Sequence, residues 1–319
     1  MRWPSALVLT LVASPAASDF LLQHPVDCEL GKTCHIQNYV DHQPAGTVQD
    51  FRCGGLSYDG HKGTDFALPN LAAMRNGVAV LAAAPGIVQG VRNGMTDQRY
   101  EPENAEQIAG RECGNGVVIA HENGWETQYC HMRRGSVRVK SGDRVEAGTV
   151  LGEIGLSGKT QFPHLHLSVR KDGQSIDPFV PNGADGCTAP EGTLWQDTPD
   201  YVPGSLISVG FSDRVPEYDH VLAGDAALST LTAKADAIVF YGHAFGSRPG
   251  DILRLEVTGP QGTLFSQDVE LDRAQAQLYR ATGRRLTQAG WHVGTYQGVA
   301  SLIRDGETIS QKITTIPVR

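Results

Sequence analysis

The chain has 319 residues, of which 40% are hydrophobic, and it carries a formal net charge of −8 at pH 7. This length is enough for two domains with proper cores, and its 37 glycines and 17 prolines favour a turn-rich β protein over a disordered one. The acidic balance argues against nucleic acid or an anionic membrane surface as the main partner, although a plain acidic soluble protein carries the same charge.

The first 18 residues are typical of a secretory signal peptide. Arg2 precedes an apolar run over residues 6–13, and small residues follow up to Ser18. The run is too short for a stable membrane anchor, and no later run approaches the length of a membrane span. We therefore expect cleavage near Ser18 and export to the periplasm or the extracellular space.

The cysteines favour disulfides over a thiolate metal site, because their number is even and they follow a signal peptide. The pairings we expect, among the many that six cysteines allow, are Cys28 with Cys34, Cys53 with Cys187, and Cys113 with Cys130. The first pair closes a small loop, and the second brackets a histidine-rich block. A two-residue hairpin turn at residues 123–124 sets Cys130 opposite Val117, so the third pair requires the chain before Gly114 to fold back.

Residues 19–55 are polar and irregular, and we expect an N-terminal extension that wraps the following core. His24, His35 and His42 lie there without a motif, which favours surface or packing roles.

The first candidate site residues are His61 and Asp65, four residues apart. Gly60 and Gly63 argue against a helix here, so the segment is predicted to be a loop that runs into a strand. Strands are then predicted over residues 77–82 and 86–91. The polar insertion over residues 93–112 is either a rim or lid near the site or a disordered loop.

Residues 117–121 and 126–131 are predicted to form a hairpin, because Asn123-Gly124 between them is a strong turn signal. On its second strand Tyr129 and His131 are expected to share a face, while Cys130 points the other way. His121 is expected to be an exposed residue at the end of the first strand.

A strand with alternating character follows, His164-Leu165-His166-Leu167. Side chains alternate between the faces of a strand, so the histidines project to one side, about 6.5 Å apart, and the leucines project into a core. Two imidazoles side by side on one surface suit a metal site.

Taken in order, these motifs resemble the lysostaphin-type (LytM-like) zinc metallopeptidases of peptidase family M23, which cut peptidoglycan cross-links. The motifs are His61-x-x-x-Asp65, Tyr129-x-His131 and Pro163-His164-Leu165-His166, with matching flanks at residues 114–119, 139–145 and 177–178. The resemblance covers about residues 61–178. Gln161-Phe162 stand where the family more often has a loop rich in Gly and Ser or Thr, which leaves the metal site intact.

Within this resemblance, residues 139–153 are expected to form a structural hairpin. The same pattern of Gly, Asp, Val and Leu also occurs in lipoyl and biotin carrier domains. A carrier needs an exposed, modifiable lysine at the hairpin tip, and nothing in this segment supplies that context.

The resemblance assigns His61, Asp65 and His166 as ligands of one zinc ion per chain, and His131 and His164 as catalytic residues beside it. Two neutral imidazoles and one carboxylate leave such a site with a net charge of about +1, which lowers the pKa of a bound water. The two other histidines can hold the attacking water and stabilise the oxyanion.

The last third of the chain is patterned separately. Residues 188–204 are rich in Pro, Gly, Asp and Thr and are predicted to be an interdomain linker. The following short candidate strands suggest an immunoglobulin-like β-sandwich: residues 206–211, 237–242, 252–257, 263–267, 294–302 and 307–313. Residues 272–285 fit either a helix or a strand. His220, His243 and His292 follow no ligand spacing and are expected in the core or on the surface.

The sequence therefore predicts a mainly β protein in four parts. Residues 1–18 are the signal peptide, and residues 19–187 are a LytM-like antiparallel β-sheet domain that binds zinc and includes the N-terminal extension. Residues 188–204 are the linker, and residues 205–319 are the immunoglobulin-like accessory domain.

The predicted function is that of a secreted zinc endopeptidase that hydrolyses peptide cross-links of bacterial peptidoglycan during cell wall remodelling. The first alternative is a catalytically silent LytM-like domain that binds and activates a cell-wall amidase, and the second is a carrier or wall-binding module without chemistry. The intact ligand set favours the enzyme. The bond that is cut, the oligomeric state and the role of the C-terminal domain stay open.

Overall fold

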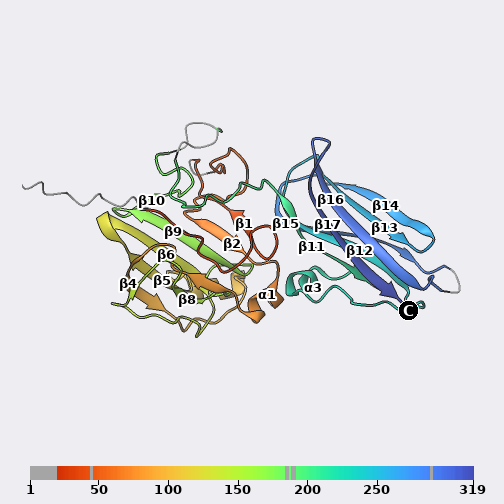
Figure 1. The fold of residues 1–319 in the computed structure, drawn as a ribbon, viewed down its shortest axis with the longest axis horizontal. Helices are drawn as coiled ribbons and strands as arrows, with labels where there is room; N and C mark the ends of the chain where they lie inside the picture. The colour runs from red at the N-terminus through yellow and green to blue at the C-terminus, as the bar shows by residue number, and fades with distance from the viewer. Residues whose placement is uncertain (1–19, 44–45, 184–186, 188–191, 288–289) are drawn as a thin grey trace, which may run out of the picture.

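The computed structural model of the chain describes residues 20–43, 46–183, 187, 192–287 and 290–319. The predicted signal peptide and residues 188–191 of the predicted linker lie outside the described residues. Two β-rich parts lie side by side, the first made mainly by residues 20–183 and the second by the residues from 205 onward (Figure 1). The mainly β fold with antiparallel sheets confirms the prediction. None of the helices that the structure describes combines the length and the apolar character of a bilayer-spanning helix.

One antiparallel sheet dominates the first part, with its strands in the order β1-β2-β9-β6-β5-β4-β7 and with β10 paired to β9. Its strands are β1 (His35–Asn38), β2 (Thr64–Ala67), β4 (Gly86–Arg92), β5 (Asn115–Ala120), β6 (Trp125–Met132), β7 (Arg144–Val145), β9 (His164–Lys171) and β10 (Gln174–Ile176). The strands that carry the candidate site residues, β2, β9 and β6, are therefore neighbours near the middle of the sheet.

Strand β9 shows the predicted alternation. Leu165 and Leu167 are fully buried and, with Val169, belong to the core of the first part. His164 and His166 lie on the opposite face. A buried apolar row on one face fixes the strand register, because a slip by one residue would exchange the two faces.

Residues 139–153 do not form the predicted hairpin. Strand β7 pairs with β4, whereas β8 (Val150–Glu153) pairs with β3 (Ala79–Leu81) in a separate two-stranded sheet. The backbone of the turn between them is bonded to Ala82 instead, through Gly148 N to Ala82 O (2.8 Å) and Ala82 N to Thr149 O (2.9 Å). The segment therefore forms two short strands, β7 and β8, which are joined by a turn and pair with different strands and not with each other.

The second part consists of two antiparallel sheets around one core, as in an immunoglobulin-like sandwich. One sheet has the order β11-β12-β15 and the other the order β14-β13-β16-β17. The strands are β11 (Ser205–Ser212), β12 (Ala237–Ser247), β13 (Ile252–Gly259), β14 (Gly262–Glu270), β15 (Gln275–Arg285), β16 (Gly294–Arg304) and β17 (Glu307–Val318). Strand β15 resolves the segment that the sequence leaves open between helix and strand.

Short helices connect some of these strands: α1 (Leu71–Asn76), α2 (Ala105–Ile108) and α3 (Tyr218–Ala223). Helices α1 and α3 face each other across the boundary between the two parts (Figure 1). The Arg75 guanidinium donates a hydrogen bond to Ala223 O (3.2 Å) there.

The described residues of the predicted linker pack against the first part. Leu22 N donates to Leu194 O (2.7 Å), and the neighbouring Trp195 is only 2% exposed within the core of the first part. Further along, the Tyr201 hydroxyl donates to Asp50 Oδ2 (2.9 Å). Residues 192–204 are therefore an integral layer of the first part as well as a connection to the second.

Strand β1 also contacts the second part. The His35 ring stacks on Phe245 with centroids 4.5 Å apart, and Phe245 belongs to the core of the first part although it lies on β12. Gln37 Nε2 donates to Ala276 O (2.8 Å), and Gln277 Nε2 donates to Gln37 Oε1 (3.0 Å). The two parts thus share a packed, hydrogen-bonded junction.

We propose that residues 19–187 and 205–319 are two domains and that the segment between them belongs structurally to the first. A chain of residues 19–204 is then expected to fold, whereas a chain ending at residue 190 loses Trp195. Removing a buried tryptophan costs about 3–5 kcal/mol, so the shorter chain is expected to unfold at a lower temperature. Circular dichroism melting of both chains, with Trp195→Ala in the longer one, measures this. Equal melting temperatures for the two chains would contradict it.

The junction also makes the stability of the protein sensitive to pH. His243 is 1% exposed, and its burial, assisted by the neighbouring His35, lowers its pKa to about 4. In the unfolded chain a histidine binds its proton near pH 6.5, so between pH 6.5 and pH 4 the unfolded state holds more protons than the folded state. Stability is therefore lost as the pH falls through this window.

Between pH 7 and pH 5 we expect His243 to lower the free energy of unfolding by on the order of 1–2 kcal/mol. Urea unfolding of the wild type and of His243→Leu at both pH values tests this, since the variant should lose less stability on acidification. His292→Leu, at an exposed position, is the matched control and should follow the wild type. An equal loss of unfolding free energy between pH 7 and pH 5 in all three proteins would show that His243 is not the cause.

Candidate metal centre

The structure brings the three predicted ligands together. His61 Nε2 lies 3.2 Å from Asp65 Oδ1 and 3.1 Å from His166 Nδ1, and the latter two atoms are 2.8 Å apart. Two ligand atoms about 2.1 Å from a tetrahedral zinc ion lie about 3.4 Å apart, so this triangle has nearly the size that zinc requires. Within the described residues, these three side chains form the group suited to hold a metal ion.

Strand pairing explains two of the three positions. Asp65 on β2 and His166 on β9 are Cα partners in the antiparallel ladder, so their side chains share a face. His61 approaches from the preceding loop, in which Gly63 packs directly against His166. A Cβ at position 63 would lie 2.6 Å from His166 Nε2 and 2.7 Å from Leu167 O, so a larger residue would displace the ligand.

Hydrogen bonds orient both imidazoles. His61 Nδ1 donates to Tyr39 O (2.6 Å), which leaves the lone pair on Nε2 for the metal. His166 shows the reverse arrangement, since its Nε2 donates to Ser168 Oγ (3.0 Å) and its Nδ1 is the atom in the triangle. In each ring the proton is on the nitrogen that points away from the centre. The nitrogen that faces the centre is therefore unprotonated and can bind a metal.

The carboxylate is oriented from strand β1. Asn38 Nδ2 donates to Asp65 Oδ2 (2.9 Å), so Oδ1 is the oxygen that faces the histidines. Asp65 is 1% exposed, and burial by itself opposes its ionisation. The neighbouring imidazoles of His61 and His164 outweigh that cost and hold the pKa of Asp65 well below its usual range. Two imidazoles and one ionised carboxylate, all nearly buried, are a donor set that suits zinc.

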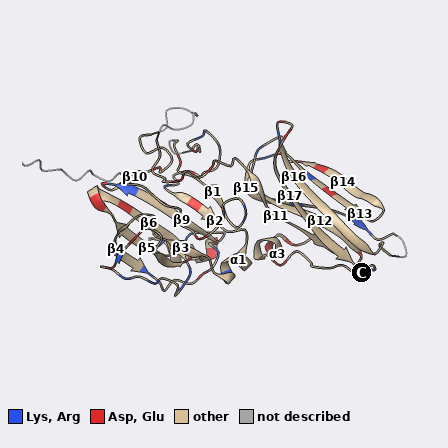
Figure 2. Ribbon diagram, in the orientation of Figure 1, with Lys and Arg blue, Asp and Glu red and all other residues tan. Residues whose placement is uncertain are grey.

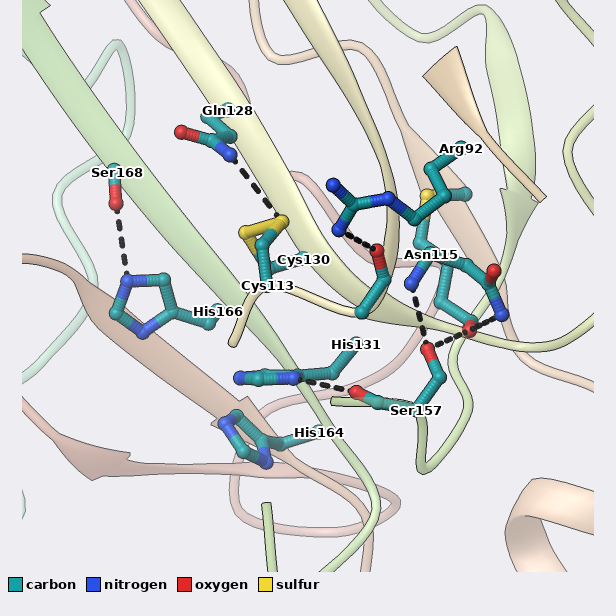
Figure 3. The surroundings of a disulfide bond; sticks show 12 residues. Arg92, Cys113, Asn115, Gln128, Cys130, His131, Ser157, His164, His166 and Ser168 are labelled. Carbon is teal, nitrogen blue, oxygen red and sulfur yellow. Dashed lines mark hydrogen bonds between the residues drawn. A yellow bond between two sulfur atoms is a disulfide. The ribbon is translucent and has the colours of Figure 1, made fainter. Parts of the chain in front are cut away.

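His131 and His164 lie beside this group (Figure 3), with ring centroids 4.7 Å apart. His131 Nδ1 donates to Ser157 O (2.8 Å), and His164 Nδ1 donates to Phe162 O (2.9 Å). His164 Nε2 lies 3.4 Å from Asp65 Oδ1. Burial, with the nearby His164 and His166, lowers the pKa of His131 well below its usual range. At neutral pH His131 is therefore a neutral imidazole that can accept a proton.

The expectation that Tyr129 and His131 share a face is wrong. Tyr129 is the Cα partner of Leu167 and points into the core, where its hydroxyl accepts from Ala83 N (2.8 Å). Cys130, the partner of His166, occupies the metal-bearing face. His131 reaches that face because its backbone is left-handed, with φ at +64°, which interrupts the alternation of the strand.

The turn before β6 is also longer than predicted. Asn123-Gly124 belong to a 3₁₀ turn, Glu122–Gly124, and His121 N donates to Trp125 O (2.9 Å) across it. Val117 therefore lies opposite Tyr129 and not opposite Cys130. Because Val117 does not lie opposite Cys130, Cys130 can bond Cys113, as expected from a chain that folds back before Gly114. The three predicted disulfides are confirmed: Cys28–Cys34, Cys53–Cys187 and Cys113–Cys130.

Comparison with known proteins identifies one domain of the chain. The profile of peptidase family M23 matches residues 59–178, which contain all five candidate residues. Over 120 residues, 37% of this chain, the sequence is 32% identical to the DD-carboxypeptidase/endopeptidase Mpg of Neisseria meningitidis serogroup B. Residues 59–178 form a peptidase M23 domain. Zinc-dependent hydrolysis of peptides is the general type of activity in this family.

Two further similarities each cover less than half of the chain. The chain is 31% identical over 118 residues, 37% of its length, to the peptidoglycan DD-endopeptidase ShyC of Vibrio cholerae. The catalytic domain of the M23 protein EnpA from Enterococcus faecalis is 28% identical, with a TM-score of 0.31, over 46% of this chain and 92% of that one. The matches to Mpg and ShyC each cover 22% of the relative, so the chain spans only about a fifth of their length.

Sequence reasoning misses the residues that orient the M23 site. Ser168 follows His164 and His166 at the same two-residue spacing, so the strand alternation is a signal that could have found it. Asn38 has no such signal, because its role depends on the pairing of β1 with β2. The carbonyl groups of Tyr39 and Ser157 act through the backbone, so no residue type marks them.

The insertion over residues 93–112 is a folded wall of the M23 domain. It contains a 3₁₀ turn, Pro102–Asn104, and helix α2. Gln98 N donates to Leu156 O (3.0 Å), and Tyr100 N donates to Thr160 O (2.7 Å). These contacts attach the insertion to the loop that leads into His164, which agrees with a rim and not with a disordered loop.

His121 is less exposed than expected. Its Nδ1 donates to Pro85 O (2.7 Å), and its Nε2 lies 2.8 Å from Thr127 Oγ1, which donates in turn to the Tyr129 hydroxyl. This histidine is therefore part of the packing beneath the sheet. The exposed His292 is a better histidine for control substitutions.

We expect the purified protein to hold about one zinc ion per chain and to lose it in His166→Ala and in Asp65→Ala. Each change leaves two ligands, which rarely retain zinc. Elemental analysis after dialysis measures the bound metal, and melting curves show whether each variant is folded. His292→Ala should retain the wild-type zinc content. A folded variant with stoichiometric zinc would show that the substituted residue is not a ligand.

Proposed function

We propose that the protein is an exported zinc-dependent endopeptidase that hydrolyses the peptide cross-links of bacterial peptidoglycan. The observation that carries the proposal is the group of His61 Nε2, Asp65 Oδ1 and His166 Nδ1, with the imidazoles of His131 and His164 beside it. His61, Asp65 and His166 would hold the metal. Zinc bound there would supply Lewis-acid chemistry, polarising the scissile carbonyl and making a water molecule more acidic.

The histidines outside the triangle supply proton transfer and charge stabilisation. His131, neutral because its pKa is low, accepts a proton from the attacking water through Nε2 and returns it to the leaving amine. His164 lies across from it, and a proton on its Nε2 would donate a hydrogen bond to the negative charge that develops on the carbonyl oxygen. Burial strengthens both effects, since His131 and His164 are 7% and 4% exposed.

The substrate class rests on the relatives. Mpg is named a DD-carboxypeptidase/endopeptidase, and ShyC is named a peptidoglycan DD-endopeptidase. Export is supported by the three disulfides, which persist in oxidising compartments, and by the signal-peptide pattern before Ser18. Cleavage of that segment near Ser18 would deliver the mature chain to the periplasm or the extracellular space.

The direct test is incubation of the mature protein with purified sacculi, with and without a chelator, followed by identification of the released muropeptides. Chelator-sensitive release of monomers from cross-linked material is the expected result. Release of no fragment by the zinc-loaded protein would refute the endopeptidase and favour the catalytically silent amidase activator. Stimulation of a purified amidase by the same protein would then establish that alternative.

His131→Ala and His164→Ala are expected to keep near-wild-type zinc while losing most turnover. Removing one group that acts only in the transition state typically costs on the order of 10²–10³ in rate, about 3–4 kcal/mol. Zinc content and the initial rate on sacculi are measured together, with His292→Ala as the control. Loss of zinc from His164→Ala would make that residue a ligand, and full activity of both variants would exclude the mechanism.

A further inference from the structure

A cavity of about 330 Å³ opens beside the disulfide Cys113–Cys130. Its lining comes from strands β4, β5 and β6 and from the end of the 93–112 insertion with the turn that follows it. The lining residues that matter here are Gly90, Arg92, Arg111, Glu112, Val118 and Gln128. The 93–112 insertion therefore forms a wall of this cavity as well as a rim of the metal centre.

The cavity lies on the sheet face that carries the metal centre. Gln128 on β6 is the Cα partner of Ser168, the residue that bonds His166, and Val118 on β5 is in turn the partner of Gln128. Adjacent strands lie about 4.8 Å apart, so the step from β9 to β5 is about 10 Å. An extended peptide advances about 3.3 Å per residue, so about three residues separate the two places.

The floor of the cavity has room for a peptide. Gly90, the Cα partner of Val118, has no side chain, and a Cβ built there would meet nothing within 4 Å. Gln128 is held at the edge, since its Nε2 donates to Cys113 Sγ (3.2 Å) and its Oε1 accepts from Arg170 Nη2 (2.6 Å) (Figure 3). The sheet face is thus open at Gly90, and the hydrogen-bonded side chain of Gln128 bounds it on the side of β6.

Two exposed arginines give the cavity its charge. Arg92 Nη1 donates to Gly114 O (3.0 Å), and Figure 3 shows its guanidinium extending toward the disulfide. Arg111 Nη2 donates to Gln107 O. Each guanidinium is anchored by one N–H to a backbone carbonyl, so most of its five N–H donors remain for a ligand. Anchored donors lose less rotational freedom on binding than free ones.

Glu112 is the acidic group of the lining. Its carboxylate accepts a hydrogen bond from Gly110 N (2.8 Å), and backbone hydrogen bonds, with lesser contributions from Lys159 and Arg92, lower its pKa. Two arginines and one glutamate leave one positive charge in excess. The sign of this local excess is opposite to the net charge of −8 of the whole chain, on which acidic and basic residues are interspersed (Figure 2).

We propose that this cavity is a subsite that binds a carboxylate of the peptide substrate through Arg92 and Arg111. Guanidinium groups bind carboxylates with paired, charge-assisted hydrogen bonds, which supply both affinity and direction. The occupant is a peptide because the cavity continues the sheet face of the candidate catalytic residues at a distance that an extended chain spans. The inference rests on the proposed function and specifies its substrate as a peptide with a free carboxylate about three residues from the scissile bond.

The test is the binding of an uncross-linked stem peptide to the zinc-loaded mature protein by isothermal titration calorimetry. The peptide is used with its carboxylates free and with the same carboxylates amidated. We expect the free form to bind about tenfold more tightly, the effect of one charge-assisted contact. Arg92→Gln and Arg111→Gln should each remove most of this preference without changing the affinity for the amidated peptide.

The matched control is Arg144→Gln, which removes an exposed arginine from β7 of the same sheet, outside the cavity. It should retain the wild-type preference. Equal binding of the two peptides by the wild type, or no binding of either, overturns the subsite, as does an unchanged preference in both cavity variants.

Cleavage of a cross-linked dimer separates this proposal from the enzymatic one. Arg111→Gln should raise KM for the dimer with free carboxylates and leave kcat unchanged, whereas neither constant should change for the amidated dimer. A wild type that discriminates the stem peptides but cleaves no dimer would refute the endopeptidase and retain the subsite. A wild type that cleaves both dimers equally, with unchanged KM in the variants, would refute the subsite and retain the endopeptidase.

Discussion

The pairing of β2 with β9 is the constraint on which the candidate site depends. It places Asp65 opposite His166, so that two of three candidate ligands share a face without any further adjustment. A slip by one residue would turn His166 toward the core and Leu167 toward the metal. The buried row of Leu165, Leu167 and Val169 prevents this slip, because it would expose three apolar side chains. The metal centre is therefore stabilised mainly by apolar packing on the opposite side of the sheet.

The position of the candidate catalytic residue His131 depends on an interruption of regular strand structure. His131 follows Cys130 with a left-handed backbone, and its N–H donates to Cys113 O (2.8 Å) beside the disulfide. Gly114 makes the adjoining turn possible, since its φ is +67° and a Cβ there would lie 2.3 Å from Ser157 O. Ser157 O is the acceptor for His131 Nδ1. The covalent bond, the turn and the hydrogen bond thus hold the same imidazole.

Strand β1 connects the metal centre with the second part of the protein. Its last residue, Asn38, bonds the candidate ligand Asp65, while His35 and Gln37 contact β12 and the first residues of β15. One short strand therefore serves both the site and the junction. The accessory sandwich is in this way packed against the strand that orients a candidate metal ligand, and the short linker segment around Trp195 covers the same core.

The sequence by itself determined the chemistry of the site, since His61, Asp65, His131, His164 and His166 lie in motifs whose residue types and spacing are local properties of the chain. Alternation along β9 also predicted that Leu165 and Leu167 enter the apolar core. Only the tertiary structure decided the left-handed bend at His131, the separate partners of β7 and β8, the contact of Asn38 with Asp65, and the cavity beside the disulfide. Each of these arises from pairing between segments distant in the chain, and a local pattern does not specify which strand a given strand will meet.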